Sequence, residues 1–351
     1  MRAKDLGITV GELPCGPLDK ISDVPGVTVG HSTIVSDTHN TGVTVVMPCA
    51  DDPFIRKLPC ASFVLNGFGK TAGLVQVDEL GTLETPIALT NTLNVGLVHD
   101  AMVGYMIDRC REDGVALTSV NPVVCECNDA SLNDIRERAV KAEHVLDAIR
   151  TASADFAEGA VGCGRGMTCH GLKGGVGSAS RLIRVGDETF TLGVLAQTNH
   201  GRMRDFQIGG ENIGRAIDKA LSEDAPDKGS CIMILATDLP VNDRQLRRIL
   251  KRLSVGLARL GSYIGHGSGE VFIGFSTANR LPADAENEPI YDTRTLNESR
   301  MDLCFRAAAE CAEEAVLNAL CASETVTGYT GKIRRSLTEF TDLIRKDRGD
   351  R

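Results

Sequence analysis

The stretch GSCIMILATDLP (Gly229–Pro240) decides how the fold is read from this sequence. Its segment Cys231–Ala236 is a short apolar run rich in Ile, which is typical of a strand in the core. Directly before it, Ser222–Gly229 reads SEDAPDKG and is polar with one proline, so it predicts a surface loop. A surface loop that leads straight into a core strand is a place where a break in the chain could be tolerated. An ordinary loop between a helix and a strand explains the same pattern.

Outward from this stretch, strand-like and helix-like segments alternate along the chain. The other predicted strands are Val24–His31, Thr41–Met47, Thr189–Gln197 and Val271–Ser276. The predicted helices are Asn133–Arg150, Asp243–Leu260, Ser299–Cys321 and Gly331–Lys346. The mixture predicts an α/β protein in which helices cover sheets.

The composition excludes several classes of function. The 351 residues carry a formal net charge of −9 and no tryptophan, which argues against nucleic acid as a partner. No stretch of 18 apolar residues occurs and the first residues lack an apolar leader, so we expect a cytoplasmic protein without a membrane span. The 12 cysteines are scattered, which favours reduced buried thiols. The spacing of the cysteines and of the seven histidines predicts no metal site.

Two familiar motifs are absent. Gly69-Lys70-Thr71 resembles the end of a phosphate-binding loop, but that pattern needs glycine at position 64, which is Val64. No serine lies in a G-x-S-x-G sequence, so the nucleophile elbow of the α/β-hydrolases is missing. A catalytic serine in this chain therefore needs another means of activation.

Ser230 has such a means if the bond before it is cut. A serine hydroxyl needs a base with a pKa near the working pH, and an α-amino group has an ordinary pKa of about 7.7–8.0. Cleavage between Gly229 and Ser230 would make the serine its own base. The serine can perform this cleavage by an N-to-O acyl shift, and a glycine before it crowds the attack least.

A second candidate segment is Gly261–Glu270, which reads GSYIGHGSGE. Ser268 and Glu270 are two residues apart and would face the same side of an extended segment. A serine and a carboxylate there could hold the amine of Ser230 and relay its proton. A glycine-rich turn whose polar residues cap backbone groups explains the same sequence.

Long stretches of the chain resemble the self-processing family of L-aminopeptidase/D-amidase-esterases and β-peptidyl aminopeptidases. The resemblance covers nearly the whole chain, in the order of the family. The stretches are ISDVPGVTVGH (Ile21–His31), LETPIALTNTLNVG (Leu83–Gly96), PVVCECNDASLND (Pro122–Asp134), EGAVGCGRGMTCHGLKGGVGSASR (Glu158–Arg181), VLAQTNHG (Val194–Gly201), GSCIMILATDLP (Gly229–Pro240) and GSYIGHGSGEVFIGFST (Gly261–Thr277).

The resemblance implies a four-layer αββα sandwich, similar to N-terminal-nucleophile (Ntn) hydrolases but with different connectivity. It implies one domain over residues 1–351, processed into chains 1–229 and 230–351 that assemble further as a homo-oligomer. The nucleophile falls on Ser230 and the motif serine and acid fall on Ser268 and Glu270. The oxyanion-stabilising asparagine falls on Asn199, and the glutamate for the substrate ammonium falls on Glu126. No metal or cofactor is implied.

The sequence departs from the family at two places. Asn128 stands where an aromatic residue is common, and Lys70 stands where an acid is usual. Both could shape the substrate pocket, so small L-residues, D-Ala amides, β-amino acids and ω-amino amides all stay open as substrates. We expect a small peptide or amide with a free amine. An acyltransferase of similar processed architecture and an uncleaved, non-enzymatic homologue are the alternatives.

Overall fold

The computed structural model describes residues 1–221 and 228–346. Except for its last two positions, the predicted loop Ser222–Gly229 lies outside the described residues. The strands are β1 Thr28–Val35, β2 Asn40–Met47, β3 Arg56–Gly67, β4 Thr82–Leu83, β5 Ile87–Asn91, β6 Val123–Cys127, β7 Thr168–Cys169, β8 Leu172–Lys173, β9 Val176–Val185, β10 Glu188–Asn199, β11 Lys228–Thr237, β12 Gly267–Ser276, β13 Leu281–Pro282, β14 Val326–Thr327 and β15 Ile333–Arg334. The α-helices are α1 Leu74–Leu80, α2 Val95–Glu112, α3 Ala142–Arg150, α4 Gly214–Leu221, α5 Asp243–Leu250, α6 Leu253–Arg259, α7 Met301–Ala322 and α8 Thr341–Lys346.

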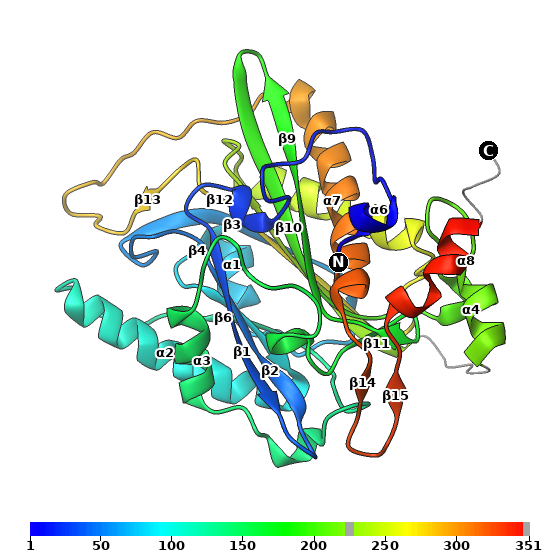
Figure 1. The fold of residues 1–351 in the computed structure, drawn as a ribbon. Coiled ribbons are helices and arrows are strands. Elements are labelled where there is room, and N and C mark those ends of the chain that lie inside the picture. Colours follow the sequence, from blue (N-terminus) through cyan, green and yellow to red (C-terminus); the bar gives the residue numbers. More distant parts are fainter. Residues whose placement is uncertain (222–227, 347–351) are drawn as a thin grey trace.

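Two sheets lie face to face between two layers of helices (Figure 1). The smaller sheet has the strand order β1-β2-β5-β6, and the larger has the order β13-β3-β12-β11-β10-β9, with β4 beside β3. Helices α2 and α3 cover the outer face of the smaller sheet, while α5 and α7 cover the outer face of the larger, with α6 packed against α7. The predicted αββα sandwich is therefore confirmed.

The core follows these layers. One apolar cluster lies between the larger sheet and its helices, a second lies between the two sheets, and a third lies under α2 and α3. Strand β11 contributes to two of them, because alternate residues of a strand point to opposite faces. Cys231 and Met233 pack toward the helices, whereas Ile232 and Ile234 pack between the sheets. The predicted core strand after Gly229 is thus confirmed, and it is buried on both faces.

Two predicted elements near the N-terminal half differ from the structure. The strand predicted over Val24–His31 begins only at Thr28, because a turn with Gly26 at φ 86° precedes it. The helix predicted over Asn133–Arg150 is wrong in its first half. Asn133 bonds to Asp129 instead, and Arg138 adopts a left-handed φ of 50°, so the chain cannot continue as a helix before Ala142.

Of the three helices predicted in the C-terminal part of the chain, one is confirmed and two differ from the structure. The long buried helix predicted over Ser299–Cys321 is confirmed as α7, which follows a short 3-10 turn. The helix predicted over Asp243–Leu260 is divided into α5 and α6, with an i→i−3 bond from the Arg252 N–H to the Ile249 carbonyl at the break. The first part of the helix predicted over Gly331–Lys346 forms β15 instead, paired with β14. None of the helices in the described residues is both long enough and apolar enough to cross a membrane.

A buried ion cluster ties the larger sheet to α7. The Arg181 side chain on β9 is fully buried and pairs with Glu310 at 3.0 Å and Glu314 at 2.6 Å, both on α7. It also lies 3.7 Å from Asp19 in the N-terminal segment. Asp19 also pairs with Arg2, at 3.3 Å. Removing the Arg181 cation would leave Glu310 and Glu314 buried without compensation, which costs far more than losing an exposed pair.

We therefore expect Arg181→Met to lower the free energy of unfolding by about 3–5 kcal/mol. The measurement is urea or thermal unfolding of the variant and the parent. Arg184→Met is the matched control, because Arg184 is exposed on the same strand and should change stability by less than about 0.5 kcal/mol. If both variants unfold like the parent, the buried cluster does not hold β9 to α7.

Candidate active site

Ser230 occupies the third position of β11, in the middle of the larger sheet. The register places it opposite Asn199 on β10 and opposite Gly269 on β12. The residue before it fits only as glycine, since a Cβ on Gly229 would lie 1.7 Å from the carbonyl oxygen of Asn199. Ser230 itself is 3% exposed. The start of β11 is therefore held tightly against the end of β10.

The Ser230 hydroxyl lies beside the bond that the sequence marks for cleavage. Its Oγ donates a hydrogen bond to the carbonyl oxygen of Gly229 at 2.6 Å. Strand β11 runs across positions 229 and 230 without a break, so the structure describes the intact chain. The Ser230 hydroxyl and the Gly229 carbonyl group are thus direct neighbours.

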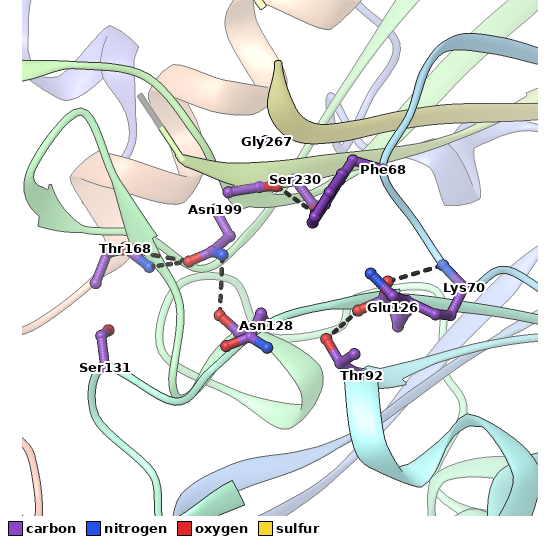
Figure 2. Close-up of a pocket in the computed structure, with 11 residues that line it drawn as sticks. Phe68, Lys70, Thr92, Glu126, Asn128, Ser131, Thr168, Asn199, Ser230 and Gly267 are labelled. Atoms are coloured by element: carbon purple, nitrogen blue, oxygen red, sulfur yellow. Dashed lines mark hydrogen bonds between the residues drawn. The ribbon is translucent and has the colours of Figure 1, made fainter. Parts of the chain in front are cut away.

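Asn199 is the last residue of β10, and its side-chain amide is fixed from two sides. Its Oδ1 accepts hydrogen bonds from the N–H of Thr168 at 2.9 Å and from the Thr168 hydroxyl at 3.2 Å. Its Nδ2 donates to the carbonyl oxygen of Asn128 at 2.9 Å (Figure 2). An amide nitrogen has two N–H groups, so one remains for a ligand in the cavity.

Glu126 lies near the end of β6, on the other sheet, and is 2% exposed. Its Oε1 accepts the backbone N–H of Lys70 at 3.0 Å, and its Oε2 accepts the hydroxyl of Thr92. A carboxylate can accept about four hydrogen bonds, so both oxygens keep capacity for a further donor. A buried carboxylate aimed at a cavity is suited to binding a cation.

These residues line one cavity of about 300 Å³. Figure 2 shows Asn199 and Ser230 on one side and Glu126 with Thr92 on the other, with the Phe68 ring between them. The cavity thus lies where the ends of the two sheets meet. Its lining residues are Phe68, Lys70, Thr92, Glu126, Asn128, Ser131, Thr168, Asn199, Gly229, Ser230 and Gly267.

Ser268 and Glu270 lie on β12, next to β11, but not in the cavity lining. The Ser268 hydroxyl donates to Glu270 Oε1, and both side chains are fully buried. The prediction that they face the same side is confirmed. Ser268 pairs with Gly229 in the register, so the alternation of the strands places this pair on the face of the sheet opposite to the Ser230 side chain. The pair is thus beside the backbone of Gly229 and Ser230.

Sequence reasoning missed the threonines that orient the site. Thr92 and Thr168 bond to Glu126 and Asn199 from segments about 30 residues away along the chain. Both lie inside the quoted motif stretches, but a threonine hydroxyl has no spacing pattern that marks it as a site residue. Only the packing of the segments shows what these residues do.

Sequence reasoning also missed a group of possible metal-binding side chains. Cys169, His170 and His200 are buried, and one ligand atom from each lies within 4.8 Å of the others. Burial lowers the pKa of His200 to about 3, so its imidazole is neutral. The three residues come from separate segments without metal-binding spacing, and they stand outside the cavity lining.

Cys231 follows Ser230 and also has a nucleophilic type of side chain, but its environment makes it inert. It is fully buried among apolar residues, and burial raises the pKa of its thiol well above the ordinary value. A buried neutral thiol on the helix-facing side of β11 cannot reach the cavity. Ser230 is therefore the side chain of this strand that could act as a nucleophile in the cavity.

The sequence pattern of peptidase family S58 matches residues 19–334, which include every site residue described above. The chain belongs to peptidase family S58. Beta-peptidyl aminopeptidase BapA of Sphingosinicella xenopeptidilytica is 37% identical over 349 residues, covering 93% of this chain and 86% of the relative.

Solved structures agree in fold. A protein from Pyrococcus horikoshii OT3 is 41% identical, with a TM-score of 0.92 over 99% of both chains. The L-aminopeptidase D-Ala-esterase/amidase from Ochrobactrum anthropi, described as a new variant of the Ntn hydrolase fold, is 32% identical. Its TM-score is 0.92 over 99% of this chain and 98% of its own. The predicted family and Ntn-hydrolase-like fold are confirmed, and this S58 chain is a peptide-bond hydrolase of the aminopeptidase type.

Proposed function

We propose that this aminopeptidase cuts itself between Gly229 and Ser230 and then uses Ser230 as an N-terminal nucleophile. Its substrates are small peptides, amides or esters with a free amine. The observation that carries the proposal is the shared cavity, which has Ser230 and Asn199 at one end and Glu126 at the other. The names of the relatives make β-amino acid residues and D-Ala amides and esters candidates for the first residue, beside L-residues.

Self-cleavage needs the Ser230 oxygen to attack the carbonyl carbon of Gly229. A new C–O bond forms, the C–N bond breaks, and the proton of the hydroxyl moves to the departing nitrogen. Water then hydrolyses the ester, which leaves a carboxylate on Gly229 and an amine on Ser230. The products 1–229 and 230–351 stay together in this scheme, because β11 and β12 of the smaller pair with β10 and β3 of the larger.

In turnover the freed amine of Ser230 takes the proton of its own hydroxyl as the oxygen attacks the substrate carbonyl. The remaining N–H of Asn199 Nδ2 stabilises the oxyanion. The ammonium then protonates the leaving amine, and water resolves the acyl-enzyme by the same steps. Ser268 is suited to holding this amine, because its strand position is opposite Gly229, whose bond to the Ser230 nitrogen is the one that breaks. Glu270 holds the Ser268 hydroxyl and favours the protonated amine.

Glu126 receives the ammonium of the substrate in this scheme, which makes the enzyme an exopeptidase. The support is its burial together with its two oriented oxygens. No cofactor takes part. We further propose a cytoplasmic location and a homo-oligomer of processed two-chain units. The 12 free cysteines support the first proposal, and the exposed apolar residues Ile290 and Tyr291 support the second.

The first prediction concerns processing. Purified protein should separate under denaturing conditions into 1–229 and 230–351, and the smaller fragment should begin Ser-Cys-Ile-Met. Ser230→Ala should remain one chain. Gly229→Ala should be cleaved more slowly, because its Cβ would lie 1.7 Å from the Asn199 carbonyl oxygen. Gly96→Ala is the control, since nothing lies within 4 Å of a Cβ there. A fully active enzyme that remains uncut overturns self-processing.

The second prediction concerns Glu126. Glu126→Gln removes the charge that would hold the substrate ammonium, so KM for free-amine substrates should rise about 10- to 100-fold. Processing should continue, because the bond at Gly229 has no such ammonium. Steady-state kinetics on fragments confirmed by mass measure this. Acetylating the amine of the substrate should abolish turnover in the parent enzyme, and equal rates on free and acetylated substrates would disprove the role of Glu126.

The third prediction concerns the catalytic groups. In cleaved enzyme, Ser268→Ala and Glu270→Gln should each lower turnover by about 10²–10⁴-fold, and Asn199→Ala by about 10²–10³-fold. A nearby carboxylate raises the pKa of an amine, so Glu270→Gln should move the lower limb of the pH–rate profile to lower pH. Ser262→Ala is the control, because it removes another buried hydroxyl from the same segment. Near-parental turnover with an unshifted profile in both relay variants would show that the pair is only structural.

A further inference from the structure

The charged side chains of the cavity lie at one end. Among the described residues that line it, Glu126 and Lys70 are the two that carry a charge. They are close neighbours, because the backbone N–H of Lys70 bonds to Glu126 Oε1 at 3.0 Å. Figure 2 shows both on the side away from Thr168, with the Lys70 side chain turned back toward Glu126. The end that would receive an ammonium therefore also presents a cation.

The Lys70 ammonium has no anionic partner in the part of the chain that the structure describes. Its Nζ lies 4.6 Å above the centroid of the Phe68 ring, and no ion pair within 4.0 Å joins it to Glu126 or to another described carboxylate. Lys57, by contrast, pairs with the buried Glu84. Lys70 is exposed to the cavity mouth, so its three N–H donors are open to a ligand.

We propose that Lys70 binds a carboxylate on the first residue of the substrate, close to the carbon that bears the free amine. The proposal rests on the proposed function, since Glu126 must hold the amine and Ser230 must attack the carbonyl. An ammonium at Glu126 places neighbouring substituents next to Lys70, on the same side of the cavity. The leaving group of the substrate is bonded at the Ser230 end, so its carboxylate is farther from Lys70.

Two kinds of first residue carry this chemistry. An N-terminal aspartate or glutamate in an ordinary peptide has its side-chain carboxylate close to the amine. An isoaspartyl residue is joined to the next residue through its side-chain carboxyl and keeps its α-carboxylate on the very carbon that bears the amine. In both, the ammonium matches Glu126 and the carboxylate matches Lys70, the two charged side chains of the cavity.

The test uses pairs of chromogenic substrates that differ only in a carboxylate. The first pair is aspartic acid β-p-nitroanilide with its α-carboxylate free, against the same compound as the α-carboxamide. The second pair is aspartic acid α-p-nitroanilide against asparagine α-p-nitroanilide. The first pair reports an isoaspartyl substrate and the second an ordinary acidic residue. The readout is the ratio of kcat/KM, carboxylate over neutral partner, in processed enzyme.

We expect a ratio of about tenfold or more in the parent for at least one pair. Lys70→Met should reduce that ratio to about one or below, Lys70→Arg should restore part of it, and added salt should shrink it. Lys251→Met is the matched control, because Lys251 also lies over a phenylalanine ring, at 5.6 Å from Phe63, but outside the cavity lining. Its ratio should equal that of the parent.

Parent ratios near or below one for both pairs overturn the proposal, and so does a Lys70→Met ratio equal to that of the parent. A Lys70→Met variant that gains equally on charged and neutral substrates also overturns it, because Lys70 would then merely compete for Glu126. In each of these outcomes the enzyme still hydrolyses free-amine substrates, so the proposed function stands. No hydrolysis of any free-amine substrate would instead refute the proposed function itself.

Discussion

The close approach of β11 to β10 at Gly229 is the constraint on which the site depends. With only 1.7 Å between the place of a Cβ and the Asn199 carbonyl oxygen, the chain accepts glycine there and nothing larger without moving. The contact fixes the register that sets Ser230 opposite Asn199. A slip by one residue would turn every side chain of β11 to the other face and put Cys231 in place of the serine. This backbone contact is therefore consistent with only one register, the one that turns Ser230 toward the cavity beside Asn199.

The layered core explains how so polar a site can be buried. Apolar clusters fill the space between the two sheets and the space under the helices, and they support β11 from both faces. The polar residues gather where strands end: Asn199 closes β10, Glu126 lies one residue before the end of β6, and Ser230 is near the start of β11. Backbone groups at strand ends are not all paired within the sheet, so they can form hydrogen bonds with polar side chains. The polar site can therefore be buried there without disturbing the packing of the apolar core.

The family resemblance predicted the layers, and it named Ser230, Asn199 and Glu126, which the structure brings to one cavity. Local boundaries of helices and strands were predicted less well. The α7 helix and the core strand at Ile232 follow directly from apolar patterning, which tertiary packing only reinforces. The first half of the helix predicted over Asn133–Arg150 failed because the left-handed residue Arg138 and the side-chain bonds of Asn133 outweigh helix periodicity. The hydrogen bonds from Thr92 and Thr168 could not be predicted from the sequence, because contacts between distant segments leave no local pattern.

The two departures from the family pattern, Lys70 and Asn128, have one structural feature in common. Each supports the site through its backbone: the Lys70 N–H holds Glu126, and the Asn128 carbonyl holds Asn199. A backbone contact survives a change of side chain, so either position can vary without disturbing the groups that it orients. The conformational entropy that Glu126 and Asn199 lose on being oriented is lost when the chain folds, before any substrate binds. Preorganised sites have this property. Selection for a new substrate can then act on the side chains at 70 and 128, because they face the cavity while their backbones keep the machinery in place.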